Sequence, residues 1–171
     1  EAILVILSLC VAMVIAEVGL RIIDHPLSKP HVDYAIWYRP SAYFGHELIP
    51  GFDGLGPLSV PVTINAQGFR DDEHQREKPA GTIRVLGLGD SFTFGWGVST
   101  NETFLKQLER QLRIQTGQPV EAINAGVPGW GLSQYDLYLR RDDLNYSPDI
   151  IVVAYFVDDL SGPMSSGVVG E

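Results

Sequence analysis

The residues most suited to catalysing a reaction lie in a Gly-Asp-Ser turn. Val85 to Leu88 is apolar, Gly89 and Asp90 follow, and Ser91 comes next. A small-residue turn between a buried strand and a helix presents a serine hydroxyl at the rim of an α/β sheet, where it can act as a nucleophile. Backbone amides at the start of the helix can stabilise an oxyanion on the attacked carbonyl. The turn therefore predicts a serine nucleophile at Ser91.

Two later blocks, Asn124 to Gly129 and Phe156 to Leu160, complete a pattern with this turn. The three blocks in this order resemble the SGNH/GDSL hydrolase family over roughly residues 82 to 160. In that family the serine attacks an ester, and the oxyanion is held by the serine amide, a glycine amide and an asparagine side chain. The resemblance implies Ser91 as the nucleophile, Gly126 as the oxyanion glycine and Asp158 at the position of the oxyanion asparagine.

The sequence also departs from the family pattern. A carboxylate at Asp158 accepts hydrogen bonds but cannot donate one to an oxyanion. The family takes its base from a C-terminal Asp-x-x-His, whereas no histidine follows Ser91 here. Without a base a serine hydroxyl is a poor nucleophile at neutral pH. The resemblance thus predicts a nucleophile position with no evident base, since the four histidines all precede it: His25, His31, His46 and His74.

These residues also have interpretations that involve no catalysis, and other kinds of site are not expected. Turn chemistry alone favours Ser91 as a helix cap, with Asp90 bonding to its own turn. Gly87-Leu88-Gly89 begins like a dinucleotide-binding loop, but Phe92 stands where a third glycine is needed. His25 and His31 have no cysteine companions, so a zinc site is not expected. We therefore expect neither a cofactor nor a metal.

Composition excludes one class of partner. Twelve Lys and Arg face twenty-one Asp and Glu, which gives a formal net charge of -9 without any basic block. Such a chain is not expected to bind the phosphate backbone of a nucleic acid. Cys10 is the one cysteine and cannot form an internal disulfide. A length of 171 residues fits one anchor and one domain.

The N-terminal segment is apolar and predicts a membrane anchor. Ala2 to Ala16 carries no charge, and Val18 to Ile23 carries only Arg21. As a helix, residues 2–23 would measure about 33 Å, close to the thickness of a hydrocarbon core. We therefore expect a single-pass transmembrane helix in contact with lipid, with the remaining chain extracytoplasmic. A signal peptide and a lipoprotein anchor are the alternatives.

The segment from 24 to 81 is rich in proline and aromatic residues. It predicts an irregular connection with one strand at Val60 to Asn65. The aromatic residues between Tyr34 and Phe44 could form a belt at the membrane interface or pack under the domain. Asp71 to Lys78 is a run of charged residues, which is typical of a solvated loop.

From residue 82 onward, strands alternate with helices, which predicts a parallel sheet with right-handed crossovers. We expect an α/β, flavodoxin-like SGNH-type domain over 82–171, after a transmembrane helix at 1–23 and the connection at 24–81. The last strand is apolar on both faces and is therefore expected at the centre of the sheet. The expected strands are Ile83–Leu88, Val120–Ile123 and Asp149–Phe156, and the expected helices run from an Asn101 cap to a Gly117 stop and over Leu132–Leu144.

Two functions fit these observations. The first is a membrane-tethered, non-catalytic SGNH-like domain that serves as an accessory subunit of a larger membrane protein assembly, for which a respiratory or photosynthetic complex is conceivable. It rests on the missing base and on Asp158. The second is an extracytoplasmic serine esterase or O-acyltransferase that acts on acylated polysaccharide, with its Asp-x-x-His in a part of the protein beyond residue 171. The intact Gly89-Asp90-Ser91 favours the second.

Overall fold

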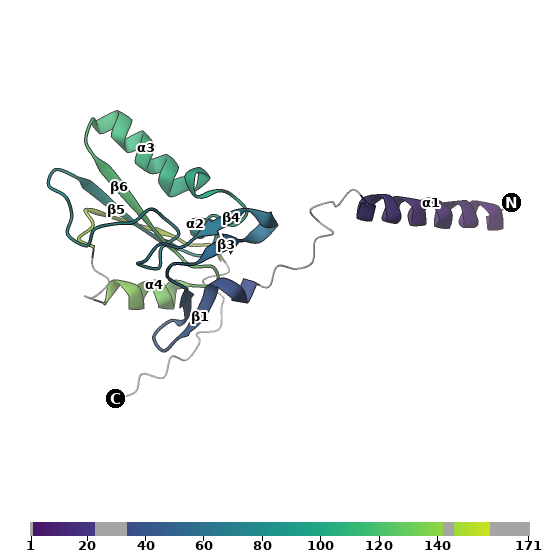
Figure 1. The fold of residues 1–171 in the computed structure, drawn as a ribbon, viewed down its shortest axis with the longest axis horizontal. Coiled ribbons are helices and arrows are strands. Elements are labelled where there is room, and N and C mark those ends of the chain that lie inside the picture. The colour runs from purple at the N-terminus through teal and green to yellow at the C-terminus, as the bar shows by residue number, and fades with distance from the viewer. Residues whose placement is uncertain (1, 23–33, 142–145, 158–171) are drawn as a thin grey trace. The chain divides into compact units, whose positions relative to one another are not determined.

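The computed structural model describes residues 2–22, 34–141 and 146–157. Contacts within the chain divide it into two units, residues 1–33 and residues 34–171. Each unit is considered by itself below (Figure 1).

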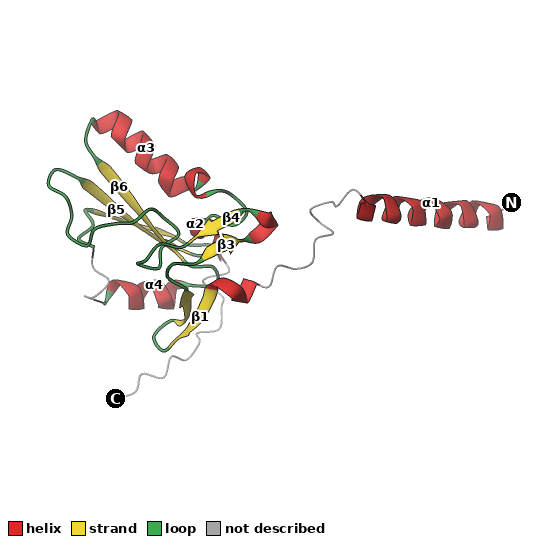
Figure 2. Ribbon diagram, in the orientation of Figure 1, coloured by secondary structure: helices red, strands yellow, loops and turns green. Residues whose placement is uncertain are grey.

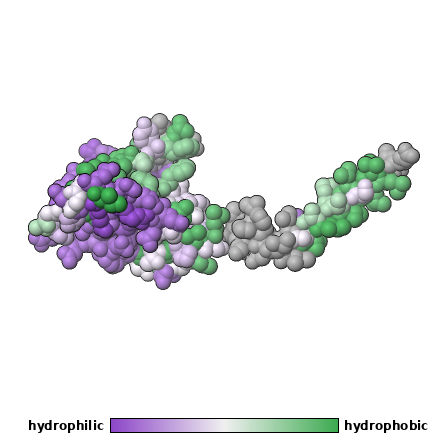
Figure 3. Space-filling view, turned by 90° about the horizontal axis from the view of Figure 1, so that it is seen from above, coloured by the Kyte–Doolittle hydropathy of each residue, from purple (hydrophilic) through white to green (hydrophobic). Residues whose placement is uncertain are grey.

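The first unit contains helix α1, Ala2–Ile22. Its large apolar side chains are exposed from Leu4 to Val18, and Figure 3 shows a mainly apolar surface there. In the parts of the chain that the structure describes, no helix is long and apolar enough to cross a membrane. The expected helix thus forms, but the transmembrane span is not supported.

The second unit begins with two short antiparallel hairpins where we expected an irregular connection. Strand β1 (Tyr38–Ser41) pairs with β2 (Gly45–Leu48), and β3 (Asp53–Leu55) pairs with β4 (Pro61–Thr63). Strand β4 lies within the expected strand at residues 60–65, and the others were missed because each is only three or four residues long. One short 3₁₀ helix, Tyr34–Trp37, precedes β1, and another, Pro57–Ser59, lies between β3 and β4.

The aromatic residues near these hairpins pack largely inside the domain. Trp37 is fully buried, and its ring stacks on Phe94 at a centroid distance of 6.3 Å. Phe44 is also buried and lies 4.7 Å from the ring of Trp130. Of the two arrangements considered for this cluster, the structure therefore shows packing under the domain for these rings, while Tyr43 is exposed.

Three parallel strands form the sheet of the domain (Figure 2). They are β5 (Ile83–Gly89), β6 (Val120–Gly126) and β7 (Ile150–Ala154), in the order β6-β5-β7. The predicted parallel α/β sheet is confirmed. The predicted central position of the last strand is wrong within the described part of the chain: β5 is central, and the apolar side chains of β7 are partly exposed at an edge.

Helices lie on both sides of this sheet, with α3 on one side and α4 on the other (Figure 1). Helix α3 (Phe104–Thr116) packs Leu105 into a core with Val85 and Val120. Its N-cap is Thr103 rather than the expected Asn101, and Gly117 ends it at φ +67°, as predicted. The remaining helices are α2 (Ser91–Phe94), the 3₁₀ turn Thr100–Glu102 and α4 (Leu132–Leu139), the last shorter than predicted.

Candidate active site

Ser91 lies at the sharp turn between β5 and α2. Asp90 caps α2, because its Oδ1 accepts a hydrogen bond of 2.9 Å from the amide of Phe92. Gly89 allows the tight approach, since a Cβ there would lie 2.0 Å from Thr93 Oγ1 and 2.7 Å from the carbonyl oxygen of Ala154. The expected strand–turn–helix is present, and it places Ser91 at the carboxyl end of the central strand of the described sheet.

Ser91 is partly exposed and lines a pocket of about 670 Å³. The pocket lies between the turn after β5, the loop after β6 and strand β1. Its walls are mostly apolar, and about 670 Å³ is within the usual range of small-molecule sites. The lining residues are Tyr38, Ser91, Phe92, Gly95, Trp96, Val98, Pro128 and Gly129.

Gly126 is not among these lining residues. Its amide donates a 3.1 Å hydrogen bond to Oδ1 of Asn124, and a Cβ at Gly126 would lie 2.4 Å from the backbone nitrogen of Phe94. Gly126 therefore packs β6 against α2 instead of facing Ser91 across the pocket. The glycine that shares the pocket with Ser91 is Gly129, at φ +83°. The sequence offered Gly129 as an alternative to Gly126, because it is the second glycine of Gly-Val-Pro-Gly, three residues after the first.

Asp158, the predicted oxyanion position, lies outside the described residues, as do His25 and His31. His46 lies next to the Pro128–Gly129 part of the pocket wall. Its Nε2 donates a 2.9 Å hydrogen bond to the carbonyl of Pro128, and its own carbonyl accepts one of 2.9 Å from Trp130 Nε1. His46 thus holds the loop that carries Gly129, and it does not itself line the pocket.

The charged run at 71–78 is partly buried, so its interpretation as a solvated loop was wrong at two positions. Asp71 and His74 are buried, with His74 Nε2 3.1 Å from Asp71 Oδ2. They have Asp-x-x-His spacing but precede Ser91, and neither lines its pocket. Asp71 also accepts a 2.8 Å hydrogen bond from the amide of Asn124 and pairs with Lys106 at 2.5 Å. This Asp-x-x-His therefore holds the segment between β4 and β5 against β6 and α3.

Arg70 fastens the same segment to the turn after Ser91. Its Nη1 donates to the carbonyls of Phe94, at 3.0 Å, and Gly95, and its Nη2 donates to the carbonyl of Val98. Burial lowers the pKa of Arg70 to about 10, so the guanidinium stays charged at neutral pH. The sequence indicated no role for the Arg70 side chain, because nothing local in Gly68-Phe69-Arg70 shows which carbonyls it will meet.

The described residues contain no cluster of three or more His, Cys, Asp or Glu side chains that could hold a metal ion. What they do contain is a serine at a strand–helix turn of a parallel α/β sheet, open to an apolar pocket. These features define an α/β domain with a serine-hydrolase type of site. Residues 88–169 match the GDSL-like Lipase/Acylhydrolase family, which supports the resemblance of this segment to SGNH/GDSL hydrolases. Comparison with curated proteins gives no match.

Proposed function

We propose that this chain carries the nucleophile and the acyl-binding pocket of an ester hydrolase or acyltransferase. The observation that carries the proposal is that Ser91 and Gly129 line one pocket whose other walls are mostly apolar. An apolar wall suits the acyl part of an ester, because burying it removes apolar surface from water.

The proposed chemistry is acyl transfer to Ser91. Its Oγ bonds to the ester carbonyl carbon, the bond to the alcohol oxygen breaks, and the alcohol leaves with a proton. Water or a second alcohol then takes the acyl group from Oγ. We place the oxyanion near the start of α2 and Gly129, since backbone amides there would stabilise the negative charge that develops on the carbonyl oxygen.

The base for this chemistry is not supplied by a described histidine lining the pocket. Of the two that the structure describes, His46 is bonded to Pro128 and His74 is buried beside Asp71. We therefore expect the chain as given to bind esters without turning them over, and to need a base from elsewhere in the working protein. An acylated carbohydrate remains the substrate we propose for that protein.

External imidazole tests this proposal. The rate of p-nitrophenyl acetate hydrolysis is measured for the chain and for Ser91→Ala over a series of imidazole concentrations, and the difference isolates the Ser91-dependent part. We expect no difference without imidazole and a difference that grows as imidazole is added, because the small base can enter the open pocket. A Ser91-dependent rate without imidazole would show that the chain already has a base. No difference at any concentration would favour a non-catalytic domain.

A non-catalytic accessory subunit of a membrane assembly is the second candidate. It is supported by the exposed apolar side chains of α1, among them Leu4 at 69% and Ile15 at 66% exposure, which would be costly in water. In this role α1 would contact lipid or other subunits, and the α/β domain would stand outside the cytoplasm. Asp158 in place of a neutral donor fits the same role.

A further inference from the structure

A second pocket, of about 440 Å³, lies beside the Ser91 pocket and has a different chemical character. Strand β1 borders both pockets: Tyr38, at its start, lines the Ser91 pocket, and Arg39, Pro40 and Ser41 line the second. The loop after β6 is shared in the same way, with Gly129 in the first pocket and Trp130 in the second.

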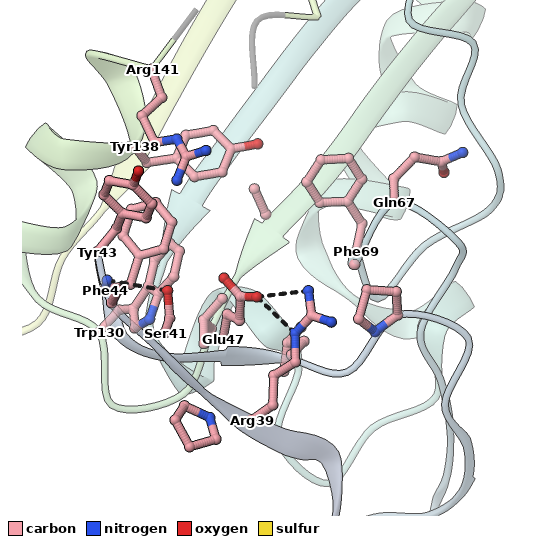
Figure 4. A pocket seen from close by; sticks show the side chains of 17 residues that line it. Arg39, Ser41, Tyr43, Phe44, Glu47, Gln67, Phe69, Trp130, Tyr138 and Arg141 are labelled. Atoms are coloured by element: carbon pink, nitrogen blue, oxygen red, sulfur yellow. Dashed lines mark hydrogen bonds and ion pairs between the residues drawn. The ribbon is translucent and has the colours of Figure 1, made fainter. Parts of the chain in front are cut away.

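Aromatic side chains make one wall of this pocket (Figure 4). Phe44 lies 4.7 Å from Trp130 and 6.3 Å from Tyr138, so these rings support one another and are held in place. Tyr43 is 65% exposed. The guanidinium of Arg141 lies over its ring, 4.3 Å from the ring centroid. Rigid aromatic faces attract the weakly positive C–H groups of a ligand.

Polar groups lie between that wall and Phe69 on the opposite side (Figure 4). Arg39 and Glu47 are paired across the β1–β2 ladder, and Arg39 Nε and Nη2 both lie 2.7 Å from Glu47 Oε1. Both contacts end on Oε1, which leaves Oε2 to accept a hydrogen bond. Ser41 Oγ accepts the amide of Phe44 at 3.4 Å and keeps its proton for donation.

These polar groups discriminate between ligand classes. A purely apolar chain would cover the Arg39–Glu47 pair and leave its charged groups without water, which is costly. A strongly charged ligand would have to displace Arg39 or Glu47 from the partner of opposite charge that each already has. A neutral ring with several hydroxyls meets neither cost, because each hydroxyl can both donate and accept, while the C–H face of the ring packs on the aromatic wall.

We propose that this pocket binds a sugar ring of a neutral carbohydrate through Glu47, Arg39 and the aromatic wall. The inference goes beyond ester chemistry, since binding requires no reaction at Ser91. If the proposed hydrolase activity is also correct, the position of the pocket across β1 from Ser91 suits the alcohol part of an acylated carbohydrate.

Calorimetric titration of the full chain carrying Ser91→Ala tests the binding by itself, so that its outcome does not depend on hydrolysis. The probes are cellobiose, xylobiose and N,N′-diacetylchitobiose. We expect at least one of them to bind, and Glu47→Gln in the same background to weaken that binding by about tenfold or more, because the acceptor of the hydrogen bond loses its charge.

Asp136→Asn is the matched control, since Asp136 pairs with Arg140 at 2.8 Å on an exposed helix surface and does not line the pocket. It should leave the affinity unchanged, and thermal unfolding should confirm that both variants fold. Absence of binding by all three disaccharides would overturn the proposal. Equal effects of Glu47→Gln and Asp136→Asn would overturn it as well.

Discussion

At the scale of single residues, the side chains that shape the site are mostly ones that do not touch a substrate. Asp71 is the clearest case, since its buried carboxylate contacts Lys106, His74 and the amide of Asn124. Burial would raise the pKa of Asp71, but the contact with His74 and the charge of Lys106 outweigh it and hold the pKa below its usual value. The ionised form of Asp71 therefore stabilises the fold.

Replacing Asp71 with Asn should lower the free energy of unfolding by about 3 kcal/mol, because Lys106 loses a buried partner. Urea denaturation measures this, with Asp136→Asn as the exposed control that should leave the free energy of unfolding nearly unchanged. Since the folded pKa of Asp71 is lowered from 3.8, the difference between wild type and Asp71→Asn should be full above that pH and shrink as the pH falls below it. A difference that persists unchanged in acid would contradict this assignment.

At the scale of elements, the site depends on how closely the ends of two strands approach a short helix. Helix α2 has only four residues, and Arg70 supports it through the carbonyls that follow Ser91. Gly89 and Gly126 are paired in the β5–β6 ladder, and both sit too close to α2 for a side chain. The position of Ser91 is thus set by backbone contacts that only glycine permits.

Gly126→Ala should therefore destabilise the domain by about 3 kcal/mol, because the added Cβ would lie 2.4 Å from a backbone nitrogen that cannot move freely. Gly117→Ala is a useful comparison: it has φ +67° but no atom within 4 Å, so only backbone strain of about 1 kcal/mol is expected. Denaturation midpoints of the two variants give the test. Similar losses for both would mean that the crowding at Gly126 is relieved by small shifts.

At the scale of the whole molecule, the chain consists of two units with different surfaces. Residues 34–171 form the unit that contains the buried core, whereas α1 in residues 1–33 exposes apolar side chains from Leu4 to Val18. These observations assign folding stability to the second unit. They leave attachment to lipid or to other subunits as the role we propose for α1.

Deleting residues 1–33 should then abolish flotation with phosphatidylcholine vesicles and leave the thermal unfolding midpoint of the domain unchanged. The full chain is expected to float, because burying apolar side chains of α1 in the bilayer interface is favourable. Flotation by the shortened chain would place the lipid-binding surface on the α/β domain. A lower unfolding midpoint after deletion would show that α1 contributes to the stability of the fold.

Local patterns in the sequence were sufficient for the elements that bury a regular apolar face. Ile83 to Leu88, Val120 to Ile123 and the helix ending at Gly117 are all found close to their predicted positions, because strand and helix periodicity are local properties. The Gly-Asp-Ser turn was predictable for the same reason. Residue types at neighbouring positions determine whether a tight strand-to-helix turn can form.

Tertiary structure alone decided which residues meet at the site. Nothing local shows that Gly129 rather than Gly126 lines the pocket, or that the side chains of Asp71 and His74 are buried. Their surroundings come from chain segments dozens of residues away, such as Lys106 on α3. The sequence by itself therefore determined the fold class and the position of Ser91, whereas long-range packing decided the rest of the site, because burial depends on what the distant parts of the chain bring alongside.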